Sequence, residues 1–222
     1  MTGTTCGLPN PYFLAAPTAT LATGLPPATF SSPGYNQTGA LTTFVGFEIY
    51  YKFLSSTPGG TDINLGGGGF PGPSILQQNG YMPVCLATDN PPLQRTAPAI
   101  AIAFADSVNP LSISVNFDPY GAWFSSYGST PELRRNISYS SPPQAKTFAN
   151  DESQWPNTSL MTSNYLPGDN DLQSIVSAGT FTTSNQAFVN LYVLAYGFEQ
   201  GTSIVQYSTP TYMGYIIITP FP

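Results

Sequence analysis

The segment 44–54 alternates between two kinds of side chain, and this pattern constrains the fold more strongly than any other in the chain. One set is entirely apolar or aromatic: Phe47, Ile49, Tyr51 and Phe53. The residues between them are Glu48, Tyr50 and Lys52. A repeat of two predicts a β-strand with one face in a core and the other in solvent. We therefore expect the first set to be buried, and Glu48 and Lys52 to be solvated.

Apolar runs bounded by Pro, Gly and Asn predict further strands along the chain. They fall at 82–86, 99–104, 111–117, 174–182, 187–195 and 212–219. The chain contains 23 prolines and 21 glycines, and only 131–135 has the pattern of a single helical turn. Strands without intervening helices predict an all-β fold, which we expect to be an antiparallel β-sandwich of Greek-key or jelly-roll-like type with long loops.

The length of 222 residues suits a single all-β domain. Residues 1–43 are rich in Pro, Ala, Thr and Gly, and are predicted to form an extended arm or tether. Residues 44–222 are predicted to form the domain, with a loop-rich insertion around 118–171. The longest apolar run, 99–105, has seven residues, whereas about 20 are needed for a helix that spans a membrane.

Ionisable residues are scarce: the sequence has no histidine, and 7% of its residues are charged where about 25% is usual. Catalysis by a histidine triad or by zinc-bound water is therefore excluded, and no cofactor is expected. A net charge of −6 argues against a nucleic-acid partner, because that affinity comes mostly from Lys and Arg. Arg134 and Arg135 form the only adjacent basic pair, which we expect to be a solvated turn.

Eleven acidic residues leave one catalytic class open, a carboxylate pair for glycoside hydrolysis. Most of these acids sit beside turn residues, so solvation in loops is the favoured interpretation. The segment 168–171 resembles the opening of a calcium loop through Asp169 and Asp171. It lacks the glycine at the sixth position and the closing glutamate, so we favour an Asx turn over a weak calcium site and expect no metal.

Two cysteines, Cys6 and Cys85, leave three alternatives: a disulfide, two free thiols, or a lipid on Cys6 with Cys85 as a buried thiol. Apolar residues on both sides of Cys85 predict that it is buried.

A second open question concerns the aromatic residues of the loop-rich half. We take Trp123, Phe124, Tyr127 and Trp155 as the predicted ligand-binding residues, since large aromatics dominate contacts with proteins and glycans. The alternative is that they plug one end of the sandwich.

Several short segments together resemble a family of leptospiral (spirochaete) surface lipoproteins of unassigned function. They are Cys6-Gly-Leu-Pro-Asn-Pro11, Phe44-Val-Gly-Phe-Glu-Ile-Tyr-Tyr-Lys-Phe53, Ala195-Tyr-Gly-Phe198, Tyr207-Ser-Thr-Pro210 and Met213-Gly-Tyr215. The resemblance implies that Cys6 is acylated, that the arm is a tether, and that the domain is a cell-surface module anchored to the outer membrane. It implies no catalytic residues.

These observations predict a non-enzymatic cell-surface or secreted protein that binds a host or envelope component, with a protein or glycan as partner. Contact with a membrane is expected only through a lipid on Cys6. The alternative is a self-assembling structural subunit of an extracellular filament or coat, in which copies of the chain are partners and the Pro-rich arm adds a strand to a neighbour. A carboxylate-based glycoside hydrolase is the least favoured interpretation.

Overall fold

The computed structural model describes residues 14, 16–19, 22–24, 28–35, 42–59, 63, 72–92, 100–101, 111–118, 121–125, 132–140, 143–149, 164–177, 186–199 and 201–218. Strands predominate in these residues, which confirms the predicted all-β class. The described helical segments are short: α1 (Ser74–Gln78), the 3-10 turn η2 (Asn170–Leu172) and α3 (Gln173–Ser177). No helix in this described part is long and apolar enough to cross a membrane.

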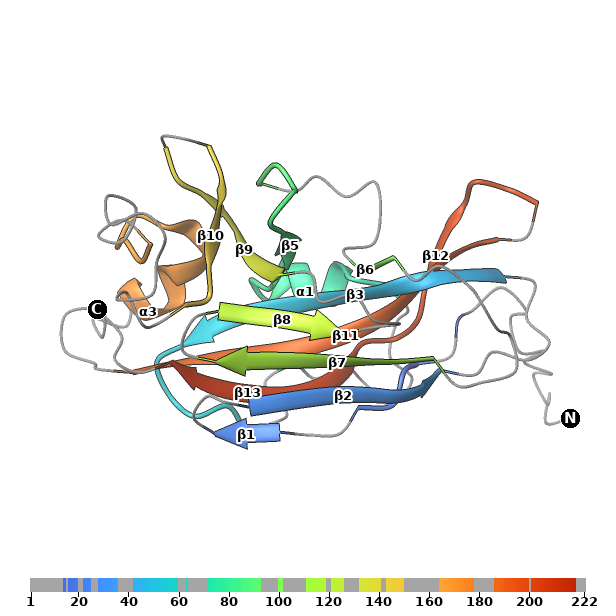
Figure 1. Cartoon of the computed structure of the whole chain (residues 1–222), viewed down its shortest axis with the longest axis horizontal. Helices are drawn as coiled ribbons and strands as arrows, with labels where there is room; N and C mark the ends of the chain where they lie inside the picture. The colour runs from blue at the N-terminus through green and yellow to red at the C-terminus, as the bar shows by residue number, and fades with distance from the viewer. Residues whose placement is uncertain are drawn as a thin grey trace, which may run out of the picture.

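The strands form two sheets (Figure 1). In the first, the order is β1 (Ala22–Gly24), β13 (Thr211–Ile218), β11 (Ala187–Glu199), β3 (Thr42–Leu54) and β4 (Met82–Pro83), with β12 (Val205–Tyr207) beside β11 and β6 (Ile100–Ala101) beside β3. In the second, the order is β10 (Ala145–Thr147), β9 (Glu132–Ser138), β8 (Gly121–Ser125), β7 (Leu111–Asp118) and β2 (Ala28–Tyr35), with β5 (Cys85–Leu86) beside β9. The described pairings are antiparallel except the parallel pair β1 and β13.

Strand β3 confirms the alternation read from the sequence. It pairs with β11 from Leu54 opposite Phe188 to Thr42 opposite Glu199. The four side chains predicted to be buried have no exposed surface and lie in the main core. Ile113, Val115 and Phe117 of β7 belong to the same core, so the two sheets share it.

Replacing Ile49 by Ala should lower the free energy of unfolding by about 2–5 kcal/mol, because the lost methyl groups leave a cavity in a packed core. Chemical denaturation followed by circular dichroism measures the change. Leu54→Ala on the same strand is the control, since Leu54 is only half-buried and its loss should cost less. An unchanged denaturation midpoint for Ile49→Ala would contradict the core assignment.

The other face of β3 is not solvated, which corrects the sequence-based expectation. Glu48 is 2% exposed and Tyr50 is fully buried. A second apolar cluster covers this face and includes Ile63, Leu76 of α1, Tyr81, Tyr192 and Leu194. Lys52 is half-buried, and its Nζ donates to the carbonyl of Asn79 at 2.7 Å. The chain after β3 thus folds back over a face that alternation alone marks as solvent-exposed.

Two segments join the sheets by contributing a strand to each. The N-terminal segment places β1 in the first sheet and β2 in the second, and the segment 82–86 does the same with β4 and β5. The structure therefore differs from the predicted arm over 22–24 and 28–35, where backbone pairing makes these residues part of the sheets.

Three other local predictions differ from the structure. The segment 118–171 is not only a loop-rich insertion, because it contains β8, β9 and β10. The helical turn predicted at 131–135 is wrong over 132–135, since these residues belong to β9. The strand predicted at 174–182 is wrong at its start, where α3 buries Ile175 in the core.

Candidate functional site

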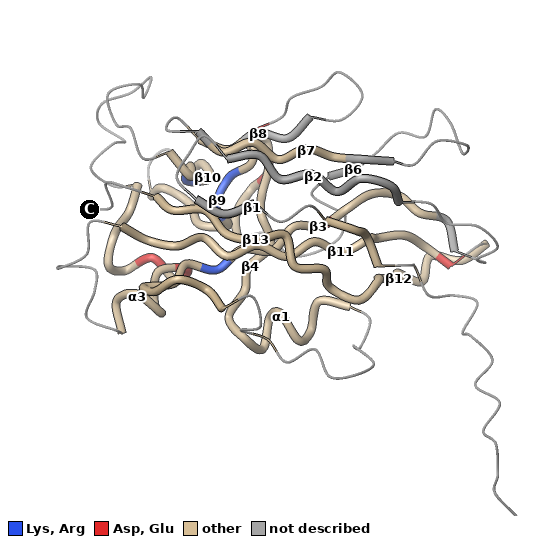
Figure 2. The backbone as a smooth tube through the Cα atoms, turned by 90° about the horizontal axis from the view of Figure 1, so that it is seen from below, with Lys and Arg blue, Asp and Glu red and all other residues tan. Residues whose placement is uncertain are grey.

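Charged residues of the described part gather toward the end of the molecule that holds α3 and β10 (Figure 2). Arg135 lies at their centre. It follows Arg134 in β9, and because neighbours in a strand point to opposite faces, only one of the two can face the interior. Arg135 is fully buried, whereas Arg134 is partly exposed and pairs with Glu132 at 2.7 Å. The expectation that both arginines form a solvated turn is wrong.

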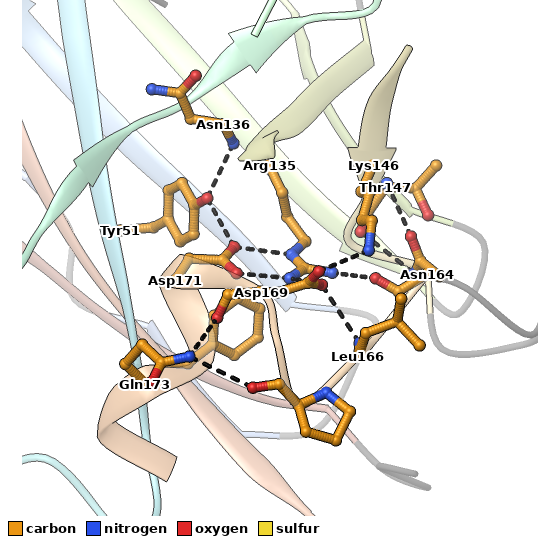
Figure 3. A network of polar contacts seen from close by, with 12 residues as sticks. Tyr51, Arg135, Asn136, Lys146, Thr147, Asn164, Leu166, Asp169, Asp171 and Gln173 are labelled. Carbon is orange, nitrogen blue, oxygen red and sulfur yellow. Dashed lines mark hydrogen bonds and ion pairs between the residues drawn. The ribbon is translucent and has the colours of Figure 1, made fainter. Parts of the chain in front are cut away.

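The Arg135 guanidinium binds two carboxylates from the η2 turn (Figure 3). Its Nε donates to Oδ2 of Asp171 at 2.8 Å and its Nη2 to Oδ1 at 2.6 Å. The same Nη2 donates to Oδ2 of Asp169 at 2.9 Å. Nη1 donates to the carbonyl oxygen of Asn164. The fork of a guanidinium matches a carboxylate in this two-bond arrangement, so the turn is fixed in orientation as well as position.

Lys146 of β10 completes the charge balance. Its Nζ donates to Oδ1 of Asp169 at 2.7 Å, and both side chains are almost fully buried. Arg135 and Lys146 together neutralise Asp169 and Asp171. Burial of charge is costly unless every charge has a partner, and this cluster meets that condition internally.

Tyr51 links the cluster to the first sheet. Its hydroxyl donates to Oδ2 of Asp171 at 2.8 Å and accepts from the backbone amide of Asn136 at 2.8 Å. Tyr51 lies in β3 and Asn136 in β9, so this one hydroxyl connects the two sheets directly and also binds the η2 turn through Asp171.

Asn164 holds the opposite side of the cluster. Its Oδ1 accepts from the hydroxyl of Tyr139 at 2.9 Å and from the amide of Thr147 at 3.1 Å. The amide of Leu166 donates to Oδ2 of Asp169 at 3.3 Å. Backbone and side-chain donors thus supplement the two cations around the carboxylates.

Aromatic rings enclose the cations. The Arg135 guanidinium carbon lies 4.5 Å from the ring centre of Tyr165 and 5.3 Å from that of Phe53, and Lys146 Nζ lies 5.6 Å from that of Tyr139. A cation over an aromatic face is stabilised by the ring quadrupole, more so when water is excluded.

Burial and the neighbouring charges shift several pKa values. Burial raises the pKa of Tyr51 well above its usual value, and the Asp171 carboxylate raises it further. Burial also raises the pKa of Tyr165, and it raises that of Tyr139 to about 12. Burial alone would lower the pKa of Arg135, but the Asp171 carboxylate outweighs it and the pKa is raised. These groups therefore keep their protons near neutral pH.

The calcium interpretation of 168–171 does not fit this geometry. The side-chain oxygens of Asp169 and Asp171 accept hydrogen bonds from Arg135 and Lys146, and a calcium ion would have to displace these cations. Across the described ranges, no group of three or more Cys, Asp or Glu is arranged to hold a metal. The carboxylates are structural anions, and the prediction that they are solvated in a loop is wrong.

The predicted ligand-binding residues lie wholly or partly outside the residues that the structure describes. Trp123 and Phe124 belong to β8 by their backbone, but their side chains lie outside the described part. Tyr127, Trp155 and Cys6 also lie outside the described residues. Cys85 is buried as predicted, and its thiol donates to Oδ1 of Asn136 at 3.1 Å.

Sequence reasoning missed the network because its members are far apart in the chain. Arg135 and its two aspartates are separated by 34 and 36 residues. One usable signal was present: Arg135 and Leu133 alternate with the more exposed Glu132 and Arg134, which is a strand pattern with an arginine on the buried side.

Comparisons with family models, curated proteins and solved structures find no match to this chain.

Proposed function

We propose that this chain is a non-enzymatic cell-surface or secreted protein that binds a host or envelope component, built as an antiparallel β-sandwich of Greek-key or jelly-roll-like type. One observation carries the proposal: the charged cluster of the described part is internally neutral, buried and saturated with protein partners. Groups held in this way stabilise a scaffold and leave little ionisable chemistry for catalysis.

The least favoured alternative, a glycoside hydrolase, needs two carboxylates that can reach a sugar. Asp169 and Asp171 are brought together by binding the same guanidinium, and both are buried. A carboxylate held this way is neither a nucleophile nor a proton donor for an external substrate. Recognition by uncharged side chains therefore fits the composition better than catalysis does.

We place the binding surface at Trp123, Phe124, Tyr127 and Trp155, and attachment to the outer membrane through a lipid on Cys6. Large aromatics supply most of the contact energy in many protein and glycan complexes. With no histidine in the chain, no side chain at its ordinary pKa changes charge between about pH 6 and 8. Affinity should therefore be nearly constant over this range.

The test begins with glycan and matrix-protein arrays, followed by affinity measurements against pH for any ligand found. Trp123→Ala and Trp155→Ala should weaken binding about tenfold or more, as expected for contact residues worth at least 1.4 kcal/mol. Trp123→Phe is the matched control, because it keeps an aromatic ring. Steep pH dependence, or parental affinity in both alanine variants, would rule out aromatic recognition.

The second candidate, a structural subunit that polymerises, is favoured by one observation, the exposed apolar residues Ile204 and Val205 beside a strand edge. Light scattering and negative-stain microscopy separate the two candidates. Long assemblies that grow with protein concentration would favour the subunit over the binding protein.

A further inference from the structure

Lys146 and Asp169 are in close contact inside the charged cluster (Figure 3). Their side chains are 3% and 7% exposed, and Nζ of Lys146 lies 2.7 Å from Oδ1 of Asp169. With a carbon–oxygen bond of about 1.2 Å, this contact puts Nζ about 3.5 Å from the carboxyl carbon Cγ. Atoms that react within a folded site are held roughly 3–3.5 Å apart, so the amine and the carboxyl carbon are near that separation.

An ion pair at this place is costly, because two charges have been taken out of water. An amide bond between the two side chains would remove both charges from the interior. The charge balance would be kept, since Arg135 and Asp171 would remain as a neutral pair with Nη2 and Oδ1 at 2.6 Å. Condensation of Lys146 with Asp169 therefore relieves a cost that the ion pair bears, without leaving a buried charge alone.

The other oxygen of Asp169 is held by two donors that would assist attack on Cγ. Oδ2 accepts from Nη2 of Arg135 at 2.9 Å and from the backbone amide of Leu166 at 3.3 Å. When an amine adds to a carboxyl carbon, negative charge develops on such an oxygen, and donors already in place stabilise it. Oδ1 accepts from Lys146 instead, so the oxygen nearest the amine is the one that can leave.

We propose that Lys146 and Asp169 condense in the folded chain to form an intramolecular isopeptide bond. One proton passes from Nζ to Oδ1 along their hydrogen bond, which gives an amine and a carboxylic acid. The Nζ–Cγ bond then forms, a second proton passes from Nζ to Oδ1, and the Cγ–Oδ1 bond breaks to release water. Nζ keeps its third proton as the amide N–H. No atom is oxidised or reduced, and no co-reactant is needed.

The bond ties the edge of the second sheet to a turn that packs on the core. Lys146 lies in β10, which pairs with β9 and with no other strand of the described part. Asp169 precedes the η2 turn, which leads into α3 and its buried residue Ile175. The two linked positions are 23 residues apart. The amide therefore closes a loop and restricts the unfolded chain, as a disulfide does.

Trypsin digestion of the denatured protein, followed by mass spectrometry, tests for the bond directly. The chain has two lysines, Lys52 and Lys146, and no lysine or arginine follows Lys146. Trypsin cleaves after a free lysine but not after one whose Nζ is in an amide. The bond should therefore leave 136–222 as one fragment, lighter than its sequence by one water molecule. An unlinked chain gives 136–146 and 147–222 at full mass.

Three variants assign the loss of water to this pair. Lys146→Arg keeps the positive charge but has no amine, so the mass deficit should disappear. Lys52→Arg is the matched control, because Nζ of Lys52 binds the carbonyl of Asn79, and the deficit should stay as in the parent. Asp169→Asn should condense with loss of ammonia instead of water, which gives a product of the same mass as that of the parent.

The folded parent protein is incubated until its intact mass is constant, and the deficit should then be present in most molecules. Cleavage after Lys146 in this sample would overturn the proposal, and this result requires no variant to fold. A water loss that persists in Lys146→Arg would overturn it as well, because it would show that an aspartate has cyclised on its own backbone.

Discussion

Replacement of Arg135 by Met is expected to lower the free energy of unfolding by about 3–5 kcal/mol, the range found when one partner of a buried ion pair is removed. The variant leaves Asp169 and Asp171 with Lys146 as the remaining cation of the cluster, so one buried negative charge is uncompensated. It also removes the two-bond contact that orients the η2 turn. Urea denaturation followed by fluorescence and circular dichroism measures the loss.

Two further variants separate charge from packing. Arg134→Ala should cost less than Arg135→Met, because Arg134 keeps some contact with solvent and binds one carboxylate, Glu132, and the Ala145 carbonyl, whereas Arg135 is fully buried between two carboxylates. Adding Asp171→Asn to Arg135→Met restores a neutral cluster and should recover part of the lost stability, as a double-mutant cycle would show. Equal costs for the Arg135 and Arg134 variants would refute the assignment of Arg135 as the central cation.

Alkaline pH should destabilise the fold steeply, starting near pH 10. Unfolded tyrosines ionise with a pKa of about 10, while burial raises the pKa of Tyr51 and Tyr165 in the folded state. Their contribution is complete below pH 10 and is lost as the pH rises toward the folded-state pKa values. Each should reduce the free energy of unfolding by about 1.4 kcal/mol per pH unit, so the two together by about 3 kcal/mol per unit.

The measurement is a series of urea denaturations from neutral to alkaline pH, with tyrosinate absorbance recorded in parallel. In the folded protein, part of the tyrosinate signal should appear only when the fold is lost, and it should appear in one cooperative step. In full denaturant, all tyrosines should titrate near pH 10. Stability that stays constant through this range would show that Tyr51 and Tyr165 are not protected from ionisation.

The all-β class and the inward face of β3 could be predicted because both depend on local spacing. A repeat of two places Phe47, Ile49, Tyr51 and Phe53 on one side of a strand. The prolines prevent long helices whatever the tertiary structure. The burial of Cys85 followed from its apolar neighbours in the same way. These predictions needed no knowledge of distant segments.

The burial of the opposite face of β3 could not be predicted. Alternation shows that the strand has two different faces, but it does not show which segments cover each face. Tyr50 is buried because α1 and the segment around Tyr81 return over that face, and Glu48 on the same face is buried as well. The same limit applies to the N-terminal segment. A proline-rich stretch with little periodicity becomes β1 and β2 only because β13 and β7 provide edges for it.

The sequence by itself determined that ionisable groups are few, that histidine chemistry is excluded, and that the chain folds into strands. Only the tertiary structure decided that Arg135 faces inward while Arg134 does not, and that Asp169 and Asp171 bind a guanidinium instead of solvent or calcium. The reason is energetic. A charged side chain is buried only where a group of opposite charge binds it, and here the two groups are more than 30 residues apart in the sequence. A local stretch of sequence does not show which distant residue will bind it in the folded chain.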